Sequence, residues 1–131
     1  MKGFIGDIEA LTIANAYFRR VLYTGRNLQL VLMTLQPGEE IGAEVHDDRD
    51  QFFRVEKGRG AVWIDGVRTE VADDDAIVVP AGARHNVANI GDAPLHLYTL
   101  YGPPEHVEGT VHRTKAEAQA HEEHFDGRTT E

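Results

Sequence analysis

The sequence predicts an all-β domain, closed as a sandwich or barrel and followed by a short C-terminal helix. Many short runs rich in aromatic and β-branched residues recur between residues 15 and 101. Turn residues separate these runs at nearly every break. Past Pro103-Pro104 the composition changes to helix-forming residues. Many short strands at this spacing are typical of a sandwich or barrel.

The first half of the chain carries four predicted strands. They cover residues 15–23, 27–35, 41–46 and 51–56. Thr24-Gly25 is a turn signal between the first two, and Pro37-Gly38 is another after the second. A polar loop at residues 47–50 separates the last two.

The second half carries five more predicted strands. They cover residues 61–64, 67–71, 76–79, 85–90 and 95–101. Asp65-Gly66 is the strongest hairpin signal in the chain, because a type I′ turn needs positive φ at both central positions. Pro80-Ala81-Gly82 ends the apolar strand before it, and Gly91-Asp92 precedes the last strand.

The C-terminal segment predicts a helix. Thr114 followed by Glu117 forms a capping box, and residues 115–123 are helix-forming. This segment has no broad apolar stripe, so we expect a surface helix with a frayed end at residues 127–131. The expected organisation is a β-barrel domain over residues 1–113 and a helix and tail over residues 114–131.

Composition narrows the function classes. The 131 residues suit one domain, and 41% hydrophobic and 27% charged residues suit a globular protein. A net charge of −9 argues against nucleic acid as a partner, because phosphate contacts need clustered Lys and Arg. No run approaches the roughly 20 apolar residues of a membrane span, and no signal-peptide pattern opens the chain. We therefore expect a cytoplasmic protein that binds neither nucleic acid nor membranes.

Two clusters carry metal-ligand chemistry. Glu44 and His46 are two residues apart on a predicted strand, so their side chains share one face. Gln51 opens the next strand, and the Pro80-Ala81-Gly82 turn delivers His85 at the start of another. Closure of a barrel allows His85 to face the first cluster. The chain has no Cys, so a metal here must be held by nitrogen and oxygen.

These clusters resemble the two signature motifs of the cupin superfamily. The positions that match the first motif are Gly38, His46 and Gly58, with Glu44 in place of its first His and Gln51 in place of its Glu. The positions that match the second are Pro80, Gly82, His85 and Asn89, with Asp74 in place of the leading Gly. The resemblance covers residues 30–101 and extends to the small single-domain cupins of the mannose-6-phosphate isomerase-like group.

The resemblance implies a cupin-type double-stranded β-helix, or jelly-roll barrel, with one divalent metal ion inside. Its implied ligands are Glu44, His46, Gln51 and His85. The formal ligand charge is that of the usual three His and one Glu. Glu44, His46 and His85 also supply a two-His-one-carboxylate set, which leaves positions open on the metal. The ion is Fe, Mn, Ni, Co or Zn; the sequence does not choose among them.

Each site residue also has a structural interpretation. In that interpretation no metal is bound. His46 and His85 are buried core histidines, Glu44 is a solvated carboxylate, and Gln51 only hydrogen-bonds its neighbours. On the last predicted strand, the sequence does not show which of His96, Tyr98 and Tyr101 face the interior of the barrel. One that does is a candidate for substrate binding or proton transfer. Alternation places Phe53 on the face of Gln51, as an apolar wall. The tail histidines lack partners at ligand spacing, so we expect them to be solvated: His106, His112, His121 and His124.

Two function classes remain. The first is a metal-dependent enzyme acting on a small oxygenated metabolite, with isomerase- or epimerase-like or dioxygenase-like chemistry. The alternative is a non-catalytic, metal-dependent sensor or carrier of a small ligand, and a metal-free barrel is a weaker third. We also expect a homodimer, because a single small barrel exposes sheet edges and the apolar run Ala14–Leu22 can supply an edge strand to a partner.

Overall fold

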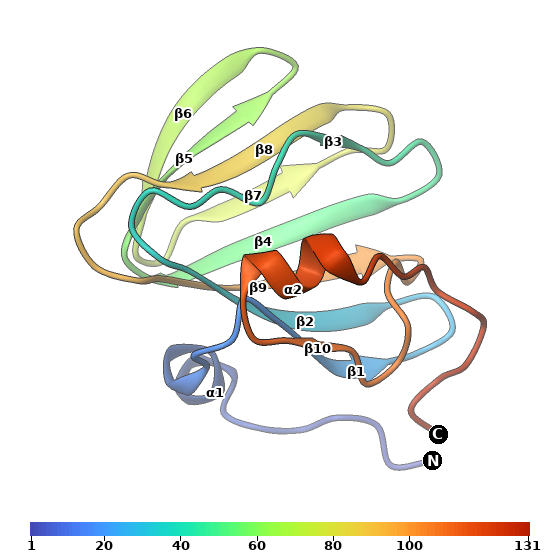
Figure 1. The fold of residues 1–131 in the computed structure, drawn as a ribbon. Coiled ribbons are helices and arrows are strands. Elements are labelled where there is room, and N and C mark those ends of the chain that lie inside the picture. The colour runs from blue at the N-terminus through green and yellow to red at the C-terminus, as the bar shows by residue number, and fades with distance from the viewer.

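The computed structural model describes residues 1–131 and confirms an all-β fold of two antiparallel sheets (Figure 1). The first sheet has the order β10 (Val111–His112), β1 (Arg19–Thr24), β2 (Gln29–Leu35), β9 (Leu95–Gly102), β4 (Asp50–Lys57) and β7 (Ala76–Val79). The second has the order β3 (Glu44–Val45), β8 (Arg84–Asn89), β5 (Arg59–Ile64) and β6 (Val67–Ala72). Two helices complete the chain: α1 (Ile8–Ala14) and α2 (Lys115–Ala120).

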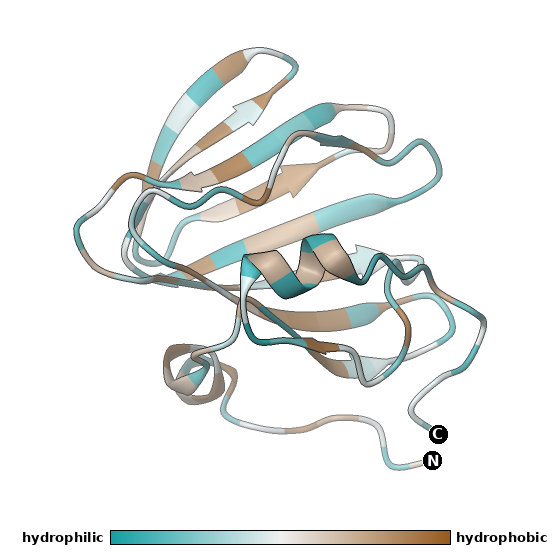
Figure 2. Cartoon of the chain, viewed as in Figure 1, coloured by the Kyte–Doolittle hydropathy of each residue, from teal (hydrophilic) through white to brown (hydrophobic).

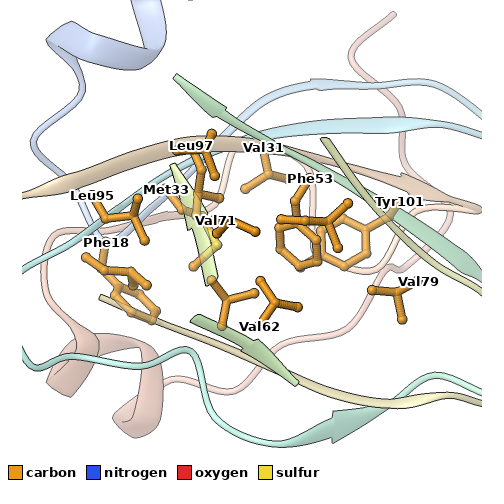
Figure 3. Packing of buried hydrophobic residues seen from close by; sticks show 14 of the residues in the cluster. Phe18, Val31, Met33, Phe53, Val62, Val71, Val79, Leu95, Leu97 and Tyr101 are labelled. Carbon is orange, nitrogen blue, oxygen red and sulfur yellow. The ribbon is translucent and has the colours of Figure 1, made fainter. Parts of the chain in front are cut away.

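The core lies between the two sheets and follows the period-two pattern of the strands. Strand β9 alternates strictly, with Leu95, Leu97, Thr99 and Tyr101 buried. One cluster of 16 buried hydrophobic residues joins both sheets, and Figure 3 shows Phe53 and Tyr101 side by side within it. Figure 2 shows hydrophobic and hydrophilic bands along β4, of which Phe53 and Val55 belong to the core. Each large apolar side chain buried here contributes about 1.5–3 kcal/mol.

The hairpin between β5 and β6 confirms the strongest turn signal of the sequence. Asp65 and Gly66 have φ of 47° and 83°, as a type I′ turn requires. The turn sets Ile64 opposite Val67. The register that follows leaves Val62 and Val71 facing the core.

The N-terminal prediction was wrong over residues 15–18, which precede β1, and it missed helix α1. Asp7 caps α1 through its Oδ1, which accepts a hydrogen bond from the Ala10 amide at 3.1 Å. Thr12, fully buried, anchors the helix to the barrel. The chain becomes a strand only at Arg19, because Asn15 turns it there by hydrogen-bonding the Tyr17 carbonyl at 2.9 Å.

The C-terminal end is tied down, which corrects the expectation of a frayed tail. The Thr24 amide donates to Thr130 Oγ1 at 2.8 Å, and the Tyr23 hydroxyl donates to Glu131 at 2.6 Å. The Gly3 amide donates to the same carboxylate at 3.0 Å, so the two termini meet (Figure 1). Neither helix has the length and apolar character that crossing a membrane would require.

The homodimer stays a prediction, but its proposed edge changes. The outer edge of β1 is occupied by β10, with Arg19 opposite His112, so residues 14–22 do not offer a free strand. Edge strands β6 and β7 carry the exposed apolar side chains Val67 and Val78 instead. We expect light scattering to give twice the chain mass of 14.6 kDa. A monomer mass at working concentration would contradict the dimer.

Candidate metal centre and adjoining cavity

Strand pairing brings the three predicted ligands together. Strand β3 pairs with β8 so that Glu44 lies directly opposite His85. His46, two residues after Glu44, leaves the same face just beyond the end of β3. One ligand atom from each of Glu44, His46 and His85 lies within 4.8 Å of the other two. The two sequence clusters therefore form one site, as predicted.

His85 has a hydrogen-bond partner on its far nitrogen, and His46 has a carboxylate near its own. His85 Nδ1 lies 3.1 Å from the Ala83 carbonyl and donates to it, which leaves the Nε2 lone pair pointing into the site. His46 Nδ1 lies 3.6 Å from Glu105 Oε2, and its Nε2 lies 3.0 Å from Glu44 Oε2. Metal-ligating histidines characteristically donate their second N–H to a carbonyl or carboxylate, as His85 does to Ala83; His46 Nδ1 lies beyond hydrogen-bond distance of Glu105. Histidines that are only packed in a core do not require their ring nitrogens to point toward a shared carboxylate.

Gln51 turns its carbonyl oxygen toward the same point. Its amide nitrogen donates to Thr99 Oγ1 at 3.0 Å, which fixes the orientation of the side chain. Oε1 then lies 3.1 Å from His85 Nε2. The side chain is only 3% exposed, so both amide groups must be satisfied inside the barrel. With the His85 proton on Nδ1, Nε2 and Gln51 Oε1 are both acceptors, which agrees with two ligands of one ion; a hydrogen bond between them requires a proton on Nε2.

The electrostatic surroundings favour the ionised form of Glu44, which is the form that binds a metal. Burial alone raises the pKa of Glu44, but the hydrogen bond with His46 and the nearby positive charges outweigh it and hold the pKa below its usual value. The hydrogen bond to Glu44 raises the pKa of His46 against the opposing effect of burial. The anionic carboxylate and the two imidazoles form a nitrogen-and-oxygen set that fits a divalent transition metal.

The last barrel strand contributes Tyr101 and not its neighbours. Tyr101 is buried, whereas His96 and Tyr98 point away from the core and are half-buried. The Tyr101 ring meets His46 edge-on at 6.0 Å between centroids, and Phe53 lies 6.4 Å from His85. Burial raises the pKa of Tyr101, so its hydroxyl keeps its proton. Phe53 thus supplies the expected apolar side of the site, and Tyr101 a hydroxyl.

A buried polar cluster behind Tyr101 was missed by the sequence reasoning. His106 and His112 are 7% and 5% exposed, so the expectation that they are solvated was wrong, whereas His121 and His124 are exposed as predicted. His106 Nδ1 lies 2.6 Å from Glu123 Oε1, and His106 Nε2 lies 3.3 Å from the Tyr101 hydroxyl. His112 Nε2 lies 3.5 Å from Glu123 Oε2.

The proton positions in this cluster follow from its acceptors. Glu123 is ionised and can only accept, because the hydrogen bond from His106 overcomes burial and lowers the pKa of Glu123. His106 therefore donates from Nδ1 and accepts at Nε2 from the Tyr101 hydroxyl. Only the fold of the tail reveals the cluster, because Glu123 lies far from Tyr101 in sequence and beyond the end of α2.

A cavity of about 300 Å³ adjoins the centre, under the C-terminal segment. Glu44 reaches its wall from the triad, and Arg19, Glu105 and His106 form much of the polar remainder. Ala118 of α2 closes one side and packs against the core, while no residue of α2 is fully buried, as expected of a surface helix. In Figure 1 this helix crosses in front of the barrel. The volume suits a small metabolite.

The buried histidines predict a loss of stability in acid. Burial lowers the pKa of both His106 and His112 below the usual value of about 6.5, outweighing the pull of Glu123. The unfolded chain therefore takes up protons first as the pH falls below about 6.5, and the free energy of unfolding falls with it. We expect urea unfolding between about pH 7.5 and 5.5 to show this fall, and His106→Gln to show a smaller one.

His121→Gln is the matched control for that measurement, because His121 is exposed. We expect it to keep the pH dependence of the wild type. Equal dependence in His106→Gln and the wild type would contradict the neutral, buried state of His106.

Comparisons with known proteins agree with this architecture. Residues 31–101 match the family model described as Cupin domain. The chain is 48% identical to an uncharacterized protein, YrkC of Bacillus subtilis, over 93% of this chain and 69% of that protein. It resembles the crystal structure of BH2720 from Bacillus halodurans with a TM-score of 0.90 and 50% identity, covering 92% of this chain and 96% of that one. A shorter stretch, 56% of this chain and 15% of the relative, is 33% identical to mannose-1-phosphate guanylyltransferase of Escherichia coli.

Proposed function

Because the chain belongs to the cupin family, we propose that it is a metal-dependent enzyme acting on a small oxygenated metabolite, with the ion held by Glu44, His46, His85 and Gln51. The convergence of the first three residues beside a cavity of metabolite size carries the proposal. A bound divalent ion would polarise a carbonyl or hydroxyl oxygen of the substrate. The reaction class is isomerase- or epimerase-like, or dioxygenase-like.

The residues of the site have distinct roles in metal binding, proton donation and the exclusion of water. Glu44 supplies the single negative charge of the donor set, and the His85 imidazole is oriented by its hydrogen bond to the Ala83 carbonyl. The Tyr101 hydroxyl, which hydrogen-bonds His106, is a candidate proton donor on the ring that packs against His46. Phe53 and the buried core keep water from the inner side of the site.

One experiment tests the proposal in two stages. Protein purified without a His tag is analysed for Fe, Mn, Ni, Co and Zn, and the metal-loaded protein is then screened with small hydroxy acids, keto acids and polyols for turnover and oxygen uptake. We expect about one equivalent of metal and turnover in at least one class. Oxygen uptake separates dioxygenase from isomerase chemistry. Tight binding without turnover under any metal would favour a sensor or carrier.

Gln51 gives a separate prediction on the metal. If its carbonyl oxygen is a ligand, Gln51→Ala weakens metal affinity by about 10–100-fold, because the neutral donor is lost while the triad stays. Gln51→Glu retains the metal, since a carboxylate replaces the amide oxygen. Competition with a chelator measures both. Thr99→Val, which removes only the hydroxyl that orients Gln51, should have a smaller effect. Unchanged affinity in Gln51→Ala would assign Gln51 to hydrogen bonding alone.

A further inference from the structure

Arg19 is a buried cation without a carboxylate partner, in the wall of the cavity beside the candidate metal centre. We infer that Arg19 binds the carboxylate group of a small organic acid there, which names the substrate class of the proposed function and rests on it. Arg19 lies at the start of β1, opposite Met33 on one side and His112 on the other. Its side chain points inward, as its 8% exposure shows.

The hydrogen bonds of Arg19 leave one edge of the guanidinium unused. Nη1 lies 3.2 Å from His112 Nδ1 and donates to it. The buried Nε has no partner, and Nη2 makes no hydrogen bond to the protein. Phe18 covers one face of the group, with Cζ 5.3 Å from its ring centroid. Nε and Nη2 share one planar edge of the guanidinium; Nε is enclosed by the protein, and Nη2 is the donor left for a carboxylate.

Nearby carboxylates are already paired with other groups. Glu105 pairs with Arg49 at 2.6 Å, and Glu123 with His106 at 2.6 Å. Glu44 pairs with His46 at 3.0 Å and is the proposed metal ligand. Arg19 forms no ion pair within 4.0 Å. The charge of Arg19 acts on Glu44 and Glu123 at longer range, but no carboxylate oxygen contacts the guanidinium directly, so an anion that enters the cavity gains a contact that the protein leaves open.

The surroundings favour a carboxylate over a phosphate. Arg19 is the one buried cation of the cavity wall, and Lys115 stands on the side of α2. The wall also carries Glu44, Glu105, Glu122 and Glu123. These acids repel a dianion more strongly than a monoanion, and a phosphate would find few donors. Arg19 Nε is enclosed by the protein, so a carboxylate in the cavity contacts the guanidinium through Nη2, and a cavity of about 300 Å³ holds a small organic acid.

The test uses the full chain freed of metal by chelation, so that chelation of the ion by the ligand does not contribute. Lactate, glycolate, their neutral amides and inorganic phosphate are titrated at constant ionic strength by calorimetry. We expect at least one carboxylate to bind roughly tenfold or more tightly than its amide, as a charge-assisted pair implies. Arg19→Gln should lose that difference. Arg20→Gln, an exposed change of equal charge on the same strand, should keep it.

A second measurement holds even if Arg19→Gln does not fold. In the labelled wild-type protein, the Arg19 Nε–H resonance should shift on addition of the carboxylate and not of the amide. Equal binding of acid and amide, a wild-type difference retained in Arg19→Gln, or tighter binding of phosphate would each overturn the inference. Metal content is measured separately: carboxylate binding through Arg19 in a protein that never retains metal refutes the proposed function and supports this subsite.

Discussion

Replacing His85 by alanine is expected to reduce the metal content of the purified protein from about one equivalent to below about a tenth. His85 is the only ligand supplied by β8, and its Nε2 faces Glu44 from the opposite strand. Its loss leaves one imidazole and one carboxylate from a single short segment. Because loss of an orienting group alone costs 10–100-fold in affinity, we expect loss of the imidazole to cost about 100-fold or more.

Elemental analysis after reconstitution measures this loss, and circular dichroism checks that the barrel is retained. His121→Ala is the control, because it removes an exposed imidazole and leaves the centre untouched. Any turnover found with the wild-type enzyme should vanish in His85→Ala and survive in His121→Ala. A full equivalent of metal in His85→Ala would contradict the assignment of the ligand set.

The centre itself was predictable because its signals are local. Glu44 and His46 share a face because side chains alternate with a period of two along a strand. Pro80 and Gly82 mark the turn before His85. The parity of the last strand needed the register of β9, which no local pattern supplies. Once Leu97 and Thr99 are seen to be buried, the inward position of Tyr101 follows.

The second polar cluster was not predictable for a physical reason. His106, His112, Glu123 and Arg19 meet only because the tail folds back over the cavity and pairs with β1. Their spacing in sequence resembles that of solvated residues, and long-range contacts determine their burial. Helix α1 had a local signal, the Asp7 cap followed by Ile8, Leu11 and Thr12, which the strand-like composition of residues 15–23 obscured.

Replacing Gly58 is expected to have the largest effect on the free energy of unfolding. Its φ is +117°, a conformation available almost only to glycine, and it follows the irregular register of β4 between Val55 and Lys57. A Cβ at this position would lie 3.0 Å from the Leu95 Cα and the Pro94 carbonyl oxygen. Both atoms belong to the backbone, so they cannot rotate away as a side chain does. Gly58→Ala therefore combines backbone strain with a steric clash.

We expect Gly58→Ala to lower the free energy of unfolding in urea by about 2–6 kcal/mol, from a conformational cost of about 1–3 and an overpacking cost of about 1–3 kcal/mol. Gly66→Ala is the matched control. Gly66 also has positive φ, +83°, but a Cβ there meets nothing within 4 Å, so only the conformational cost remains. Equal losses in the two variants would show that the contact with β9 is unimportant. A greater loss in Gly58→Ala means that this motif glycine is required by the close approach of two backbones.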